Sequence, residues 1–294
     1  MTFGQASRFS LLALLVVCCS SRPPLPPEAI ILNDEGIGFL ARGDLETADT
    51  RFRLALEYNP HFVEALTNLG LVELERGNFT RAGQLLERAR RINEHVAQPH
   101  HGLGVLAERV GDAASAAAHY RAALEVDPGF APARLNLARL LFDANQLYHA
   151  KEEFSKLTQV APDIAEAHAG LAETLIRLGR RVEAERIVAT EAPRFPDSTG
   201  LQVLQARSEL RRGQTERAIQ RLRELTERSD ADAALAFSWL AVAELTRHRP
   251  AHAIGAAKRA LALERDSRVA RHALEAALRE LGASSAPAGP ALPP

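Results

Sequence analysis

The fold is decided by residues 97–130, AQPHHGLGVLAERVGDAASAAAHYRAALEVDPGF, because small residues of this stretch return along the chain every 34 residues. One track of such residues consists of Gly36, Gly70, Gly104, Ala138, Ala172 and Ala206. A second consists of Ala48, Ala82, Ala116, Ala150, Ala184 and Ala218, and a third of Gly43, Gly77, Gly111, Asn145, Gly179 and Gly213. A seventh unit follows one inserted residue, with Ala241, His248 and Ala253 at the three places. Three tracks in phase predict a stack of repeated units.

This period and its residues resemble the tetratricopeptide repeat, a helix–turn–helix unit of 34 residues. The first unit carries the pattern as Gly36, Phe39, Ala48, Phe52, Ala55 and Pro60. The third carries it as Leu103, Gly104, Ala116, Tyr120, Ala123 and Pro128. The resemblance implies an all-α, right-handed superhelical solenoid of about seven repeats over residues 29–282. The expected units are 29–62, 63–96, 97–130, 131–164, 165–198, 199–232 and 234–267, with a capping helix at 268–282.

Each track has a physical reason. We expect the small residue early in the first helix of a unit to face the constant Ala of the second helix, which lets the two backbones approach. The Gly or Asn between the helices tolerates the left-handed conformation that ends a helix and reverses the chain. Pro cannot continue a helix, so Pro60, Pro128, Pro162 and Pro196 are expected to end the second helices of their units.

The N-terminus has the layout of a secretory signal, predicted to cover residues 1–18. The apolar run from Leu11 to Val17 is far shorter than the about 20 residues that a membrane-spanning helix needs. The chain's only cysteines, Cys18 and Cys19, follow this run. One interpretation is a plain signal with two incidental or disulfide-paired cysteines, although adjacent cysteines bridge poorly. The other resembles a bacterial lipoprotein signal, with the lipid on Cys19 or alternatively on Cys18.

The lipoprotein resemblance implies an anchor at the outer membrane of a Gram-negative cell, facing the periplasm, because serines and not an aspartate follow the cysteine. Residues 19–28 are interpreted as a Pro-rich, non-helical spacer between the membrane and the fold. Residues 283–294, rich in Ala, Ser, Gly and Pro, are predicted to be a disordered tail.

The composition and motifs favour a protein-binding scaffold over an enzyme. The formal net charge is -1, so there is no electrostatic footprint for nucleic acid. No phosphate-binding loop, nucleophile elbow or metalloprotease motif occurs. His100 and His101 are adjacent and would point about 100° apart on a helix. His248 and His252 are separated by Pro250 at a turn. We therefore predict no catalytic residue, no metal site and no cofactor.

Function is then expected on the concave face, which the resemblance assigns to the first helix of each unit. The predicted partner-binding groove consists of Asn33, Ile37, Leu40, Thr67, Leu71, Leu74, His101, Val105, Arg139 and Arg177. Its early part is apolar and its later part, which also includes Leu135, Glu173, Ile176, Arg207 and Arg211, is mixed and rich in Arg. The apolar side chains are either open to a partner or covered by neighbouring helices. The Lys and Asn clamp by which some family members hold chaperone C-termini is absent.

The combination of a signal, a cysteine, a Pro-rich spacer and such repeats resembles the type IV pilus secretin pilotins. That resemblance implies a lipid-anchored scaffold that assists the assembly or stability of a pilus secretin. The alternatives are an accessory of outer-membrane protein insertion or cell-wall synthesis, and a periplasmic holdase chaperone.

Overall fold

The computed structural model describes residues 24–227 and 233–285, and within these ranges the chain is all helical. The first half holds α1 (Pro27–Ala41), α2 (Leu45–Tyr58), α3 (Val63–Glu75), α4 (Phe79–Ile92), α5 (Ala97–Arg109), α6 (Ala113–Val126), α7 (Ala131–Asp143) and α8 (Leu147–Val160). The second half holds α9 (Ala165–Arg177), α10 (Arg181–Glu191), α11 (Thr199–Arg211), α12 (Thr215–Thr226), α13 (Ala233–Thr246), α14 (Pro250–Leu263) and α15 (Arg268–Ser285). The expected all-α solenoid is confirmed.

The turn inside each helix pair uses the left-handed backbone conformation. The residues at these turns with positive φ are Gly43, Gly77, Gly111, Asn145, Gly179, Gly213 and His248. At each of these turns one residue takes the left-handed conformation, which a Gly adopts without strain and any other residue adopts at a cost. The third track of the sequence is therefore the set of residues that close the helical hairpins.

The first track packs mainly against a larger side chain than the expected Ala. A Cβ added at Gly36 would lie 2.5 Å from the Phe52 ring, and one added at Gly104 would lie 2.4 Å from the Tyr120 ring. At these two places the small residue makes room for the large side chain one turn beyond the constant Ala, and the expectation that it faces that Ala is corrected there, because the ring needs a hollow on the facing helix. At Gly70 an added Cβ would meet Leu86 at 2.9 Å and the carbonyl oxygen of the constant Ala82 at 3.5 Å.

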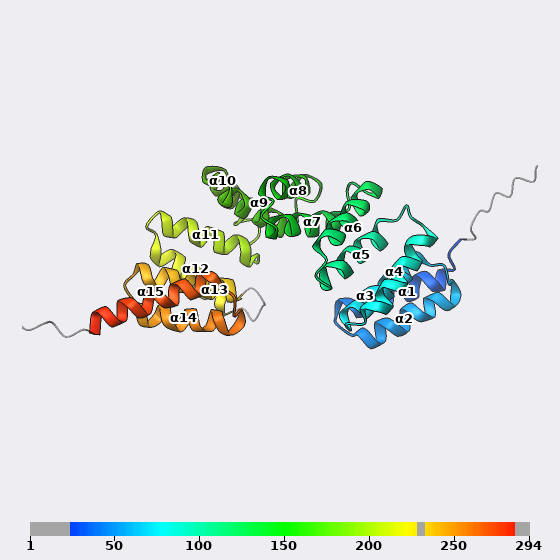
Figure 1. The fold of residues 1–294 in the computed structure, drawn as a ribbon, viewed down its shortest axis with the longest axis horizontal. Coiled ribbons are helices and arrows are strands. Elements are labelled where there is room, and N and C mark those ends of the chain that lie inside the picture. Colours follow the sequence, from blue (N-terminus) through cyan, green and yellow to red (C-terminus); the bar gives the residue numbers. More distant parts are fainter. Residues whose placement is uncertain (1–23, 228–232, 286–294) are drawn as a thin grey trace, which may run out of the picture.

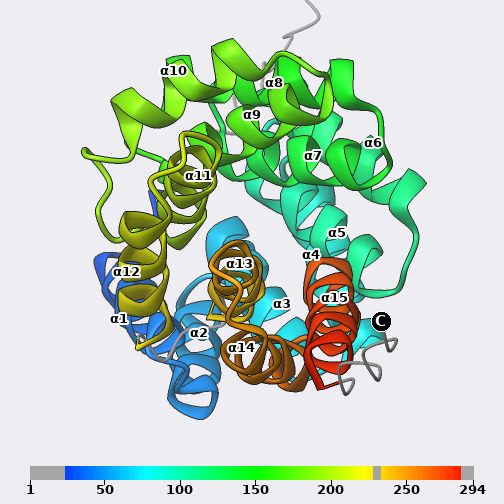
Figure 2. The same ribbon diagram turned by 90° about the vertical axis from the view of Figure 1, so that its left-hand side faces the viewer.

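The helix pairs stack side by side into a superhelix whose two ends lie far apart (Figure 1). Viewed along the stack, α5, α7, α9 and α11 lie on the inside, and their partners α6, α8, α10 and α12 lie on the outside (Figure 2). The first helices of the units thus line the concave face, and the second helices form the convex face.

Both ends of the array differ from the expected boundaries. Helix α1 begins at Pro27, so Pro27 and Glu28 are helical and the interpretation of the whole 19–28 stretch as non-helical is wrong at its last two residues. Pro is accepted there because the first N–H groups of a helix have no intrahelical partner. Leu25 packs against the cluster of Ala29 and Phe62, and so belongs to the core of the first repeat. At the other end α15 reaches Ser285, three residues into the expected tail.

The predicted signal, Cys18 and Cys19 lie outside the described residues, as does the tail from residue 286. Among the residues that are described, no helix is long and apolar enough to cross a membrane.

Candidate protein-binding groove

Three of the ten expected groove residues are buried, so the predicted groove is corrected at these three positions. Asn33, Thr67 and Leu74 are 5%, 3% and 1% exposed. Asn33 accepts a hydrogen bond from the Asn68 side chain at 3.0 Å, and the Thr67 hydroxyl donates to the Val63 carbonyl at 2.8 Å. Leu74 packs in a cluster with Leu86. These side chains stabilise contacts between helices and are closed to a partner.

The other early positions are partly available. Ile37 is 45% exposed, and the half-buried Leu40, Leu71 and Val105 pack on core clusters. These side chains contribute scattered apolar surface to the inner face.

His101 lies between two aromatic rings. Its ring centroid is 5.8 Å from that of Tyr120 and 5.6 Å from that of Phe130. The Asn136 amide nitrogen lies 3.1 Å from Nε2 of His101 and can only donate, so Nε2 accepts and carries no proton. Burial lowers the pKa of His101 to about 4. The residue is a neutral packing element of the third and fourth repeats.

A large concavity lies instead on the later repeats. A hollow of about 870 Å³ is lined by residues of α7, α8, α9, α11, α13 and the first turn of α15. An adjoining hollow of about 750 Å³ extends along the loop between α10 and α11 and shares Arg139, Glu166, Ala169, Gly200 and Leu235 with the first. We call these two the main hollow and the side hollow, and together the concave groove. Of the ten expected groove residues, Arg139 and Arg177 line it.

The main hollow has an apolar floor. Its apolar lining residues are Phe142, Phe154, Val203, Leu204, Leu235, Trp239 and Val269. Leu235 is 40% exposed and is the accessible part of this floor, whereas Val203 is almost fully buried beneath it. Such a floor can cover apolar side chains of a bound segment and so remove them from water. The hydrophobic free energy gained is about 25 cal/mol for each Å² of apolar area that is buried.

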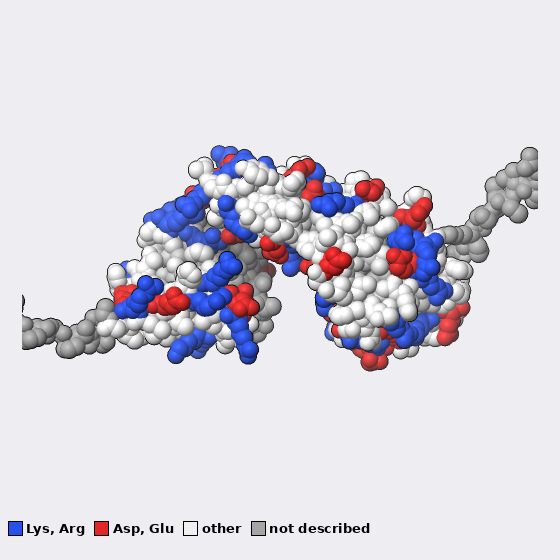
Figure 3. Space-filling view, in the orientation of Figure 1, with Lys and Arg blue, Asp and Glu red and all other residues white. Residues whose placement is uncertain are grey.

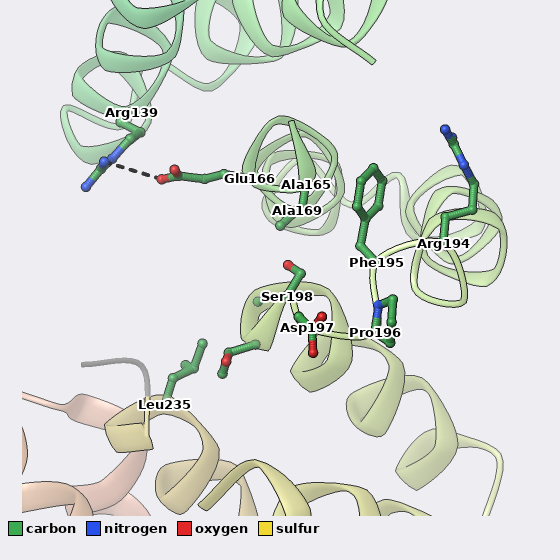
Figure 4. Close-up of a pocket in the computed structure, with 12 residues that line it drawn as sticks. Arg139, Ala165, Glu166, Ala169, Arg194, Phe195, Pro196, Asp197, Ser198 and Leu235 are labelled. Atoms are coloured by element: carbon green, nitrogen blue, oxygen red, sulfur yellow. Dashed lines mark ion pairs between the residues drawn. The ribbon is translucent and has the colours of Figure 1, made fainter. Parts of the chain in front are cut away.

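Four arginines line the main hollow, and two of them form ion pairs within it. Arg207 pairs with Glu173, and Arg139 pairs with Glu166 at 3.3 Å. The second pair lies on one side of the side hollow, and Leu235, Ser198 and Asp197 lie across from it (Figure 4). These pairs are partly exposed, and each contributes modestly to stability.

Two of the arginines also stack on aromatic rings. The Arg177 guanidinium lies 4.4 Å from the centroid of Phe142, and the Arg207 guanidinium lies 4.5 Å from that of Trp239. Stacking fixes the plane of a guanidinium and leaves its edge free to donate hydrogen bonds. The groove therefore offers pre-oriented donors beside an apolar floor.

The groove is not part of a field of one sign. Lysines and arginines are interspersed with acidic residues over the molecular face in Figure 3. In the described part of the chain, no group of three His, Cys, Asp or Glu side chains is arranged to hold a metal ion. What the groove offers chemically is apolar contact, stacking and hydrogen bonding from arginines.

Two family models, each described as a tetratricopeptide repeat, match the sequence. One matches residues 33–96 and 203–267, and the other matches residues 109–163, which together exceed half of the chain. The chain belongs to the tetratricopeptide repeat family. Members of this family are typically non-enzymatic modules that bind other proteins. No curated protein matches the sequence.

Solved structures share the fold of this tetratricopeptide repeat protein. A tetratricopeptide repeat protein from Parabacteroides merdae has a TM-score of 0.61 at 20% identity, with 86% of this chain and 100% of that chain covered. The pilF protein of Pseudomonas aeruginosa has a TM-score of 0.58 at 18% identity, with 71% and 95% covered. The protein TTC0263 of Thermus thermophilus has a TM-score of 0.52 at 22% identity, with 62% and 99% covered. At these identities the likeness is one of fold alone.

Several residues that line the main hollow were not predicted from the sequence. Phe142, Leu235, Trp239 and Arg268 line the main hollow, and none of them was expected there. Trp239 is the chain's only tryptophan, which is a signal in itself. Arg268 begins the helix that was expected only to cap the stack, and its place in the groove follows from the way α15 packs on α13.

Proposed function

We propose that this protein is a scaffold that holds a segment of a partner protein in the concave groove. The observation that carries the proposal is the main hollow, with its apolar floor and arginine edge on the inner face of a repeat stack. Hollows of several hundred Å³ with a few oriented polar groups are typical binding sites. Inner faces of helical repeats offer extended concave surfaces for partners.

We further propose that the scaffold is tethered to the outer membrane through a lipid on Cys19, or alternatively Cys18, and acts in envelope assembly. The proposed partner is a type IV pilus secretin. The predicted lipoprotein signal and the order of signal, spacer and repeats support this, and the shared fold with pilF is consistent with it.

A discrete hollow favours one recognised segment over the broad binding of unfolded chains. A holdase needs exposed apolar surface, whereas among the early inner positions Leu74 is 1% exposed and Leu71 and Val105 are half-buried. The proposal therefore prefers a single recognised segment to the alternative of a periplasmic chaperone.

The test is site-directed photo-crosslinking in the native envelope. A photoreactive amino acid replaces Leu235, which is 40% exposed in the groove, and in a matched strain it replaces Val182, which is 75% exposed on the convex helix α10. We expect a discrete adduct from position 235 only, and we expect the secretin in it. Adducts of equal yield from both positions would exclude the groove, and an adduct with another protein would exclude the secretin.

The anchor has a separate test. Replacing Cys19 with Ser should release the protein from membranes into the soluble fraction. Membrane retention in Cys19→Ser together with release in Cys18→Ser would move the lipid to Cys18. Retention in the variant lacking both cysteines would contradict the lipid anchor.

A further inference from the structure

Among the described residues that line the main hollow, the cations outnumber the anions. Its cations are Arg139, Arg177, Arg207 and Arg268, and its anions are Asp143, Glu166 and Glu173. Glu166 and Glu173 are engaged by Arg139 and Arg207. This leaves Arg177 and Arg268 against the single carboxylate of Asp143.

Arg177 has donors to spare. Its guanidinium donates to the Phe142 carbonyl at 3.3 Å and to Oδ1 of Asn145 at 2.7 Å, and both acceptors are neutral. A guanidinium has five N–H donors, so three are left for a ligand. Because the group is also stacked on Phe142, little side-chain entropy is lost when a carboxylate binds it.

Arg268 is the second such arginine of the lining. It is the first residue of α15, and it forms no ion pair with any residue that the structure describes. Next to it Val269 contributes to the apolar lining, together with Leu235 and Trp239. Among the described residues, the hollow thus combines two arginines that form no ion pair, beside the one carboxylate of Asp143, with an apolar floor.

We propose that the segment held here carries carboxylate side chains beside aromatic or branched apolar ones, and that its carboxylates pair with Arg177 and Arg268. This inference rests on the proposed function and names the chemistry of the partner. Carboxylates match the planar donor edge of a guanidinium and form charge-assisted hydrogen bonds with it. A strongly basic segment would instead leave both arginines facing like charge, which disfavours binding.

The experiment is selection from a random twelve-residue peptide phage library on the purified chain. We expect selected peptides to be enriched in Asp and Glu within two places of Phe, Trp, Leu or Ile. Enrichment in Lys and Arg, or no preference in charge, would overturn the inference while leaving the proposed function intact. A library that yields no binder at all would contradict the proposed function as well.

The selected peptides then test the two arginines directly. Fluorescence anisotropy with a labelled acidic peptide should show affinity reduced about three- to tenfold in Arg177→Gln and again in Arg268→Gln, with a weaker dependence on salt. The matched control is Arg181→Gln, an exposed arginine at the start of α10 that lines neither hollow. Unchanged affinity in the Arg177→Gln/Arg268→Gln double variant, or an equal loss in the control, would overturn the assignment of these residues.

Discussion

The early and the later repeats use the inner positions of the same fold in opposite ways. On α1 to α5 these positions are largely apolar, and Leu74 is 1% exposed in a closed core. On α7 to α13 they carry arginines and glutamates, and here the main hollow is found. The main hollow therefore lies on the less apolar stretch of sequence.

The difference has a physical cause. Apolar side chains on neighbouring helices gain free energy by closing on one another, so they fill the space that would otherwise be a groove. Charged side chains cannot be buried cheaply, and pairs such as Arg139 with Glu166 stay at the surface. An apolar inner stripe in a repeat protein is therefore evidence of packing first and of binding second.

The largest effect is expected for Leu74→Glu, which tests whether the inner face of the early repeats is closed. Placing a carboxylate at a position that is 1% exposed should cost on the order of 4 kcal/mol or more, because the charge loses its hydration without a partner. Thermal unfolding followed by circular dichroism should show a large drop in Tm, with the loss concentrated in α1 to α6 by hydrogen exchange.

The matched control is Ile37→Glu on the same inner face. Ile37 is 45% exposed, so its replacement should change stability by about 0.5 kcal/mol or less. Equal and small effects of both substitutions would mean that the early groove is open, and the comparison would then be wrong.

A second prediction concerns the close approach of helices in the early repeats. In Gly104→Ala the new Cβ would lie 2.4 Å from Tyr120, and the resulting overpacking should cost about 1–3 kcal/mol. Gly255→Ala on α14 meets nothing within 4 Å and should stabilise by up to about 1 kcal/mol through helix propensity. Urea unfolding of the two variants measures both signs, and a neutral Gly104→Ala would mean that the ring moves aside freely.

The sequence predicts the repeat scaffold well because the 34-residue tracks report backbone requirements. A left-handed turn needs Gly or Asn, and positive φ at Asn145 agrees with its place in that track. The groove is harder to predict because it depends on how side chains from several repeats fill space. Leu74 and Val105 occupy inner positions, yet one is closed and the other half-buried, and only their neighbours distinguish them.

At the groove, some residues are predictable from the sequence and others are not. Arg139 and Arg177 were expected there and line the main hollow, because their inner positions follow from the period. Arg268 was not expected, because the aperiodic C-terminal helix has no counterpart in the repeats from which to read its orientation. The partner of Gly36 was also misjudged, since sequence spacing does not say which residue of the facing helix needs the space.

A third prediction follows from His101, an inner residue of the early repeats. Burial lowers its pKa to about 4, below the ordinary 6.5, so the unfolded chain binds its proton more readily than the folded one. The stability that depends on neutral His101 is present above pH 6.5 and is lost as the pH falls toward 4. Between pH 7 and pH 5 the loss should be on the order of 1 kcal/mol, after allowance for the half-buried ring.

The measurement is the free energy of unfolding in urea at both pH values for the wild type and His101→Gln. The variant should lose less stability on acidification, since Gln does not titrate. An identical acid sensitivity of the two proteins would place His101 in open solvent, as a groove residue would be.

The smallest effect is expected at the turns inside the helix pairs, which differ between the early and the later repeats. The first three turns use Gly, whereas the seventh uses His248 at φ 54. In His248→Gly the relief of about 1 kcal/mol from the left-handed conformation is opposed by the greater freedom of Gly in the unfolded chain. It is also opposed by loss of the pair between Nδ1 of His248 and Glu280 at 2.9 Å, which is weak because the His side chain is 87% exposed. The relief is the larger contribution, so we expect a net gain of about 0.5 kcal/mol, seen as a small rise in Tm.

The reciprocal change Gly213→Ala, at φ 74, should lose about 1 kcal/mol. A loss in His248→Gly would mean that the contact with Glu280 on α15 contributes more than the strain costs, and that the last repeat depends on its capping helix.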